Sequence, residues 1–157
     1  MKLDHLAIIM DGNRRWASAN NLPSYEGHKK GAENLWNIIN TVKEFKLKFL
    51  TLFVFSTENW KRPVKEVNYL FKLLDNYIEK KIKNLLKKNI KINIIGNIKP
   101  FPSDLRYKLK NVQKMTRNNS KIQINMALNY GSRHELVFAI KKIKKKKLII
   151  NENNINS

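Results

Sequence analysis

The residues best suited to chemistry stand together near the N-terminus, directly after a short apolar run: Asp11, Gly12, Asn13, Arg14 and Arg15. Guanidinium forks match phosphate oxygens, glycine lets the backbone approach a ligand closely, and a single carboxylate can share a metal ion with a phosphate. The pattern therefore predicts a site for a metal-bridged anionic ligand such as a phosphate ester. On residue types alone, a strand-end turn in which Asp11 pairs with a neighbouring arginine is an equally good interpretation.

Similar polar clusters follow each strand that the sequence predicts. Apolar or alternating runs predict strands at 6–10, 49–55, 90–94 and 122–128. After them come, in order, the residues 11–16, 56–62, 96–97 and 129–133. Because ligands bind outside the carboxyl ends of parallel strands, we expect these clusters to line one edge of a sheet.

Helical patterns alternate with the predicted strands. Apolar spacing predicts helices over 32–45 and 64–88, a third that begins near Ser103, and a fourth over roughly 132–147, whereas 17–30 is predicted to be a loop. The apolar stripe of the helix over 64–88 predicts one face for the core. The fold class predicted is α/β, a mostly parallel central sheet built from alternating β-α units.

Composition narrows the classes of partner. The 157 residues suffice for one domain with a real core, and 32 Lys and Arg against 12 Asp and Glu give a net charge of +20. That charge favours nucleic acid, anionic membrane or phosphorylated substrates, although an excess of Lys with Asn and Ile also follows from an AT-rich genome. The absence of Cys excludes disulfides, thiolate metal sites and cysteine nucleophiles. No apolar run reaches the roughly 20 residues that span a bilayer, so we expect a cytoplasmic protein, with peripheral membrane contact as a secondary role.

The clusters also occur in a familiar order. They read His-Leu-Ala-Ile-Ile-Met-Asp-Gly-Asn-Arg-Arg-Trp-Ala at 5–17, Gly-His-Lys-Lys-Gly at 27–31, Phe-Ser-Thr-Glu-Asn-Trp-Lys-Arg-Pro at 55–63 and Asn-Tyr-Gly-Ser-Arg at 129–133. This series resembles the cis-prenyltransferases, the undecaprenyl diphosphate synthase family. The resemblance implies the fold of the cis-prenyltransferases and a homodimer that depends on Mg²⁺. It also implies an enzyme that condenses isopentenyl diphosphate with an allylic diphosphate, such as farnesyl diphosphate, in cis geometry. The product would be a polyprenyl diphosphate made by ionisation, condensation and elimination, with a hydrophobic tunnel for the growing chain. The helix over 64–88 would help to wall that tunnel, and a plain core face is an equally good interpretation of its apolar stripe.

The resemblance also assigns roles to individual residues. Asp11 would be catalytic and hold the magnesium, and Asn59 stands where the family places its proton acceptor. A neutral amide is a very poor base, so we expect Asn59 to orient a substrate group. The residues implied to bind substrate are Gly12, Asn13, Arg14, Arg15, Trp16, His28, Ser56, Thr57, Glu58, Trp60 and Arg62. A surface role for His28 and plain core packing for Trp16 and Trp60 are the structural alternatives.

Two departures from the family pattern bear on function. Ser24 stands where many members have an arginine, and the chain ends at Ser157, before a C-terminal motif of two arginines, a serine and a glutamate. We therefore expect residues 1–157 to form a single domain that lacks the family's C-terminal segment. The alternatives to an active transferase are a truncated, inactive remnant and a non-catalytic partner of a complete enzyme. A nucleic-acid-binding module is disfavoured, because the aromatic residues occupy motif positions and apolar stripes.

Overall fold

The computed structural model describes residues 3–42 and 45–155, and at its centre lies a sheet of four parallel strands. The order across the sheet is β1-β2-β4-β3. The strands are β1 (His5–Ile9), β2 (Phe49–Ser56), β3 (Ile90–Ile95) and β4 (Ile122–Tyr130). The predicted α/β class is confirmed, and so are the predicted strands, to within two residues at each end.

One face of the sheet forms the core. In register across the strands, Leu6 pairs with Leu50, Leu50 with Ile124, and Ile124 with Ile92. Except for the half-buried Leu6, these side chains are almost completely buried, and they pack with residues from the helices in one apolar cluster. Because alternate residues of a strand point to opposite faces, the same register places Thr51, Asn125 and Asn93 in a hydrogen-bonded row on the other face.

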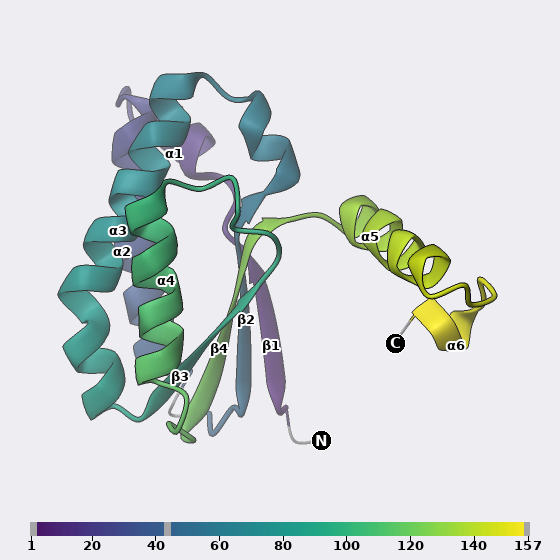
Figure 1. The fold of residues 1–157 in the computed structure, drawn as a ribbon. Helices are drawn as coiled ribbons and strands as arrows, with labels where there is room; N and C mark the ends of the chain where they lie inside the picture. Colours follow the sequence, from purple (N-terminus) through teal and green to yellow (C-terminus); the bar gives the residue numbers. More distant parts are fainter. Residues whose placement is uncertain (1–2, 43–44, 156–157) are drawn as a thin grey trace.

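The helices are distributed unequally over the two faces (Figure 1). Helices α1 to α4 lie on the apolar side of the sheet, whereas α5 and α6 extend away from it on the other side. The bounds are α1 (Asn13–Ala19), α2 (Ser24–Thr41), the 3₁₀ helix η1 (Thr57–Lys61), α3 (Val64–Lys87), α4 (Ser103–Met115), α5 (Ser132–Lys145) and α6 (Glu152–Ile155). Within the described residues, no helix is long and apolar enough to cross a membrane.

The loop predicted over 17–30 is largely wrong. Helix α1 already begins at Asn13, and α2 begins at Ser24, directly after an extended Pro23. Proline before the first turn has the extended backbone that suits a helix start, and Gly27 is accommodated inside α2 for a packing reason given below. The helix predicted over 32–45 ends earlier, at Thr41; residues 43–44 lie outside the described part.

The register between β2 and β4 shifts near the carboxyl edge of the sheet, and the shift changes the face to which side chains point. Phe53 pairs with Ala127 but Phe55 with Leu128, so β2 holds one additional residue there; β4 then holds one additional residue, Asn129, before Tyr130. Such bulges turn side chains that plain alternation would place otherwise. Phe55 is thereby buried among the helices, and Asn129 takes a left-handed backbone conformation, with φ of 48°.

Candidate active site

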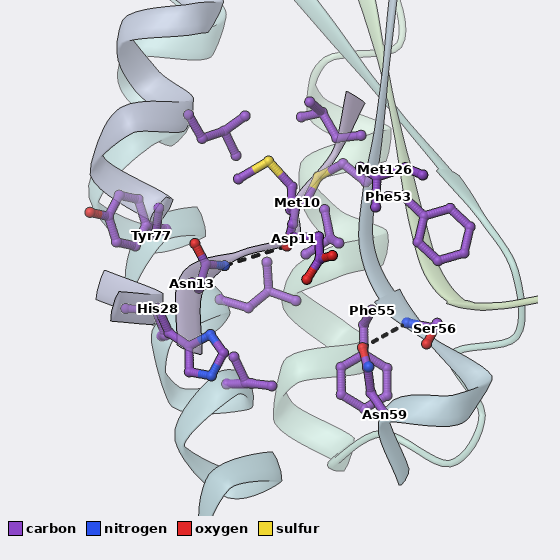
Figure 2. A pocket seen from close by; sticks show the side chains of 18 of the residues that line it. Met10, Asp11, Asn13, His28, Phe53, Phe55, Ser56, Asn59, Tyr77 and Met126 are labelled. Atoms are coloured by element: carbon purple, nitrogen blue, oxygen red, sulfur yellow. Dashed lines mark hydrogen bonds between the residues drawn. The ribbon is translucent and has the colours of Figure 1, made fainter. Parts of the chain in front are cut away.

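A cavity of about 790 Å³ runs between the apolar face of the sheet and helices α2 and α3. Its deeper walls are apolar and include Leu35, Leu74, Ile78 and Met126. Its polar wall carries Asp11, Gly12, Asn13, Arg14, Arg15, His28, Ser56, Asn59 and Arg62. Figure 2 shows Asn13 and His28 on one side of this space and Ser56 and Asn59 on the other, with Asp11 between them. The cavity thus combines a polar mouth with an apolar interior, and the helix over 64–87 serves both as core and as cavity wall.

The turn from β1 into α1 places the first polar cluster at the mouth. Gly12 has φ of 88°, a left-handed conformation that glycine adopts without strain. Its N–H donates to Oδ1 of Asp11, and Arg15 donates to Oδ2 across 3.0 Å. The local ion pair anticipated as an alternative therefore exists, and it lines the cavity as well. Both side chains are more than 70% exposed, so the pair contributes at most about 1 kcal/mol and is easily exchanged for a ligand.

Two glycines of α2 bring that helix against Asn13. A Cβ on Gly27 would collide with the backbone carbonyl of Asn13, and a Cβ on Gly31 would collide with the Asn13 side chain. Both positions lie one helical turn apart on the same face of α2. The Asn13 amide in turn donates to the carbonyl of Met10 across 3.4 Å (Figure 2). The Gly-His-Lys-Lys-Gly sequence therefore fixes the position of the first cluster through close packing.

His28 is buried and takes part in a charged network that sequence reasoning missed. Its Nε2–H donates to Oε1 of Glu66 across 3.0 Å, and Arg62 donates to the same oxygen, also across 3.0 Å. Burial by itself would raise the pKa of Glu66, but the hydrogen bond from His28 and the charges of Arg14 and Arg62 outweigh it and leave the pKa below its usual value. A surface role for His28 is therefore wrong. The only sequence signal for Glu66 was its place one turn after Arg62.

Asn59 is held in one orientation by the backbone. Its Oδ1 accepts the N–H of Ser56 across 2.9 Å, and the Ser56 side chain accepts a backbone N–H of η1 in return (Figure 2). Because an N–H must face an acceptor, the oxygen of the amide points to Ser56 and its NH₂ group is left over. That NH₂ group makes no hydrogen bond within residues 3–42 and 45–155. Asn59 can thus offer a donor at the cavity mouth.

Four predicted binding residues lie outside the cavity lining: Trp16, Thr57, Glu58 and Trp60. Trp60 packs edge-on against Phe55 and donates from Nε1 to Oδ1 of Asn129 across 2.8 Å. The Asn129 amide donates in turn to the carbonyl of Asn97 across 2.7 Å. The clusters after β2, β3 and β4 therefore meet at one edge, as predicted, but this part of the edge is joined by internal hydrogen bonds.

The residues at the cavity mouth could hold a magnesium ion only if water molecules and substrate phosphates supply most of its ligands. Among the described residues, no three His, Cys, Asp or Glu side chains gather closely enough to enclose a metal. Mg²⁺ commonly keeps several waters and takes one or two carboxylates together with substrate phosphates. Asp11 meets that requirement, because its carboxylate is 74% exposed at the mouth and stands beside arginines that would bind the same phosphates.

Comparisons with known proteins agree with this geometry. The family model described as "Putative undecaprenyl diphosphate synthase" matches residues 9–157. The isoprenyl transferase of Heliobacterium mobile is 43% identical over 139 residues, which make up 88% of this chain and 54% of that protein. The isoprenyl transferase of Campylobacter jejuni strain RM1221 is 36% identical over 154 residues, or 98% of this chain and 69% of that protein. The chain therefore spans about half the length of the first of these relatives.

Solved structures give the same result. Lavandulyl diphosphate synthase from Lavandula x intermedia, in complex with dimethylallyl diphosphate, superimposes with a TM-score of 0.91 at 26% identity, covering 99% of this chain and 70% of that one. A probable undecaprenyl diphosphate synthase from Campylobacter jejuni gives a TM-score of 0.79 at 32% identity, covering 99% and 68%. Because the family model matches residues 9–157, which are nearly the whole of this chain, the chain belongs to the undecaprenyl diphosphate synthase family of isoprenyl transferases.

Proposed function

We propose that this chain is an isoprenyl transferase that condenses isopentenyl diphosphate with an allylic diphosphate, such as farnesyl diphosphate, in cis geometry with the help of Mg²⁺. The observation that carries the proposal is a cavity in which a cluster of arginines and Asp11 opens into an apolar interior. An allylic diphosphate has the same two parts, a head with several negative charges and a hydrocarbon tail. The lavender synthase that shares the fold was crystallised with such a molecule, dimethylallyl diphosphate.

The diphosphate head would lie at the turn between β1 and α1. Arg14 and Arg15 offer guanidinium forks, the backbone at Gly12 is open to close approach, and Asp11 would hold the magnesium. The metal, when bound, neutralises charge on the leaving diphosphate. Arginine donors aimed at the same oxygens contribute in the same direction, since they stabilise the charge that develops there.

The reaction proposed is balanced without a redox partner. The allylic C–O bond breaks and its electron pair leaves with the diphosphate. The double bond of isopentenyl diphosphate attacks the allylic carbon, and a phosphate oxygen then takes a proton from the new chain. Asn59 presents an NH₂ donor, so it is suited to hold a phosphate oxygen and unsuited to accept that proton. Glu66 fixes Arg62 and His28, which also line the cavity, and both would offer donors to the diphosphate.

A homodimer with contact to a membrane surface is the assembly that we propose. Helix α5 extends away from the sheet (Figure 1), and it exposes Leu136, Val137 and Phe138 to about half or more of their full area. Apolar side chains gathered on one helix favour burial against a second copy. The last turn of α5 is rich in lysine, which would favour an anionic lipid surface close to a cytoplasmic enzyme whose product is a lipid.

Turnover tests the proposed function directly. The chain is incubated with farnesyl diphosphate, radiolabelled isopentenyl diphosphate and Mg²⁺, and labelled lipid is extracted. We expect polyprenyl diphosphate with cis double bonds, reduced about 10²-fold or more in Asp11→Ala because charge stabilisation at the leaving group is lost. Asp104→Ala, which removes an exposed carboxylate from the first turn of α4, is the matched control and should retain activity. Lack of product from the unaltered chain, with farnesyl diphosphate still bound, would favour a non-catalytic partner instead.

A further inference from the structure

The motif Asn-Tyr-Gly-Ser-Arg at 129–133 takes no part in the substrate contacts proposed so far. None of its five residues lines the main cavity, although the motif follows β4 at the same edge of the sheet as the cavity mouth. Its contacts lead instead to η1, the 3₁₀ helix that carries Asn59. The motif is therefore connected to the mouth through η1.

Asn129 combines a special backbone conformation with two hydrogen bonds. Its backbone is left-handed, with φ of 48°, a conformation that asparagine tolerates better than most residues with a side chain. Its Oδ1 accepts the indole N–H of Trp60 across 2.8 Å, and its NH₂ group donates to the carbonyl of Asn97 across 2.7 Å. An indole N–H can only donate and a carbonyl can only accept, so these partners fix the orientation of the amide. Asn129 is only 6% exposed, so both bonds are shielded from water.

The neighbouring loops hold this arrangement from two sides. The Asn97 N–H donates to the carbonyl of Asn129 across 3.4 Å, so two hydrogen bonds join the loops that follow β3 and β4. On the other side, Gly131 lies against Thr57, the first residue of η1, and a Cβ at this glycine would collide with the threonine hydroxyl. The segment that follows β4 thus contacts η1 near both of its ends.

The bond to Trp60 fixes the part of η1 that faces the substrate. The hydrogen bond between Asn59 and Ser56 ties the start of η1 to β2, whereas Trp60 ties its last part to β4. Asn59 and Arg62 both line the cavity, and they stand on either side of Trp60 in the sequence. A shift of the indole would therefore displace both of these donors.

We propose that Asn129 is a positioning residue, which through its hydrogen bond to Trp60 holds η1 where Asn59 and Arg62 can meet a diphosphate head. The inference rests on the proposed function, because it requires a prenyl diphosphate at the mouth. Trp60 then acts on the substrate through the position of η1, without contact of its own.

The size of the effect follows from the bond. One neutral hydrogen bond shifts an equilibrium by about two- to tenfold. When a binding segment is in place for only part of the time, the apparent affinity falls by the same fraction. We therefore expect loss of the indole bond to weaken the affinity for farnesyl diphosphate by about two- to tenfold.

Calorimetric titration with farnesyl diphosphate and Mg²⁺ measures this loss. Trp60→Phe keeps an aromatic ring beside Phe55 and Phe71 but removes the N–H, so it should fold and bind about two- to tenfold more weakly. Asn129→Gly keeps the left-handed backbone but removes both side-chain bonds, and it should weaken binding at least as much. Tyr107→Phe, which removes a hydroxyl from a 74% exposed ring of α4, is the matched control and should bind as the unaltered chain does.

Double substitutions separate positioning from a general loss of stability. In the Asn129→Gly background, Trp60→Phe should have no further effect, because the bond is already absent. In the Asn59→Ala background its effect on affinity should shrink, because one of the donors that η1 positions has been removed. In the Arg15→Ala background its effect should be retained in full, because Arg15 donates from α1.

The outcomes separate the inference from the proposed function. Weaker binding in Trp60→Phe that shrinks with Asn59→Ala but persists with Arg15→Ala supports the positioning role. Unchanged affinity in Trp60→Phe and Asn129→Gly, or an equal effect in the Asn59→Ala and Arg15→Ala backgrounds, would overturn it while leaving the proposed function intact. Failure of the unaltered chain to bind farnesyl diphosphate would overturn both.

Discussion

Replacing Glu66 with glutamine tests the network that positions His28 and Arg62. The carboxylate is only 10% exposed, and one of its oxygens accepts from both partners. Glutamine keeps the shape and an acceptor oxygen but removes the negative charge. Hydrogen bonds to a charged group contribute about 1.5 to 3 kcal/mol each, compared with about 1 kcal/mol between neutral groups. We therefore expect Glu66→Gln to lower the free energy of unfolding by about 1 to 3 kcal/mol.

The pH dependence gives this prediction a second readout. The pKa of Glu66 is lowered in the folded chain, so the carboxylate stabilises the fold above its usual pKa of 4.5, and the contribution is lost as pH falls through the lowered value. In the unaltered chain, this contribution declines as pH falls below about 4.5. Glu66→Gln should lack it, so the difference in stability between the two chains should be largest at neutral pH and should shrink in acid.

Urea unfolding, monitored by circular dichroism at several pH values, measures both effects. Glu79→Gln is the matched control: it lies on the same helix, its carboxylate is 66% exposed and pairs with Lys108 across 3.5 Å, and such surface pairs contribute about 0 to 1 kcal/mol. Equal losses in the two variants, or a Glu66→Gln loss that persists unchanged in acid, would refute the assignment of a stabilising charge to Glu66.

Two further substitutions test how the mouth of the cavity is built. In Gly27→Ala the new Cβ meets the Asn13 backbone, which should lower stability by about 1 to 3 kcal/mol, less the roughly 1 kcal/mol gained in helix propensity. In Gly31→Ala the Cβ meets the Asn13 side chain, which can turn aside, so thermal unfolding should show a smaller loss of stability than in Gly27→Ala. Because Asn13 is displaced, titration of Gly31→Ala with farnesyl diphosphate should show a weaker affinity than the unaltered chain. Asn59→Asp keeps an acceptor for the Ser56 N–H but removes the donor and adds a negative charge, so stability should be kept and diphosphate binding lost; normal binding by this variant would contradict the donor role.

The sequence was informative where local pattern decides structure. Continuous or alternating apolar runs predicted all four strands, and the alternation of strands with helices predicted a parallel sheet with the polar clusters at one edge. The stretch over 17–30 was misread because Gly27 and Pro23 usually indicate loops. Here Pro23 precedes a helix start, and Gly27 is required by contact with Asn13, which is distant in sequence and therefore invisible to a local pattern.

The sequence predicted many of the residues that line the candidate site, but only some of the contacts that these residues make. Asp11, His28 and Asn59 all line the cavity, as the motifs indicated. Trp60 lies outside it because its indole pairs with Asn129, a contact across 69 positions of the chain that no spacing rule reveals. Glu66 was missed for a similar reason, since its function depends on a buried partner from another helix.

The most direct measurement of the central claim compares three ligands in the presence of Mg²⁺: farnesyl diphosphate, inorganic diphosphate and farnesol. If the polar mouth holds the head while the apolar interior holds the tail, farnesyl diphosphate should bind at least about 100-fold more tightly than inorganic diphosphate, since each buried CH₂ contributes roughly 0.8 kcal/mol. It should also bind more tightly than farnesol, and Asp11→Ala should reduce that second difference. Equal affinities for farnesyl diphosphate and inorganic diphosphate would contradict the account.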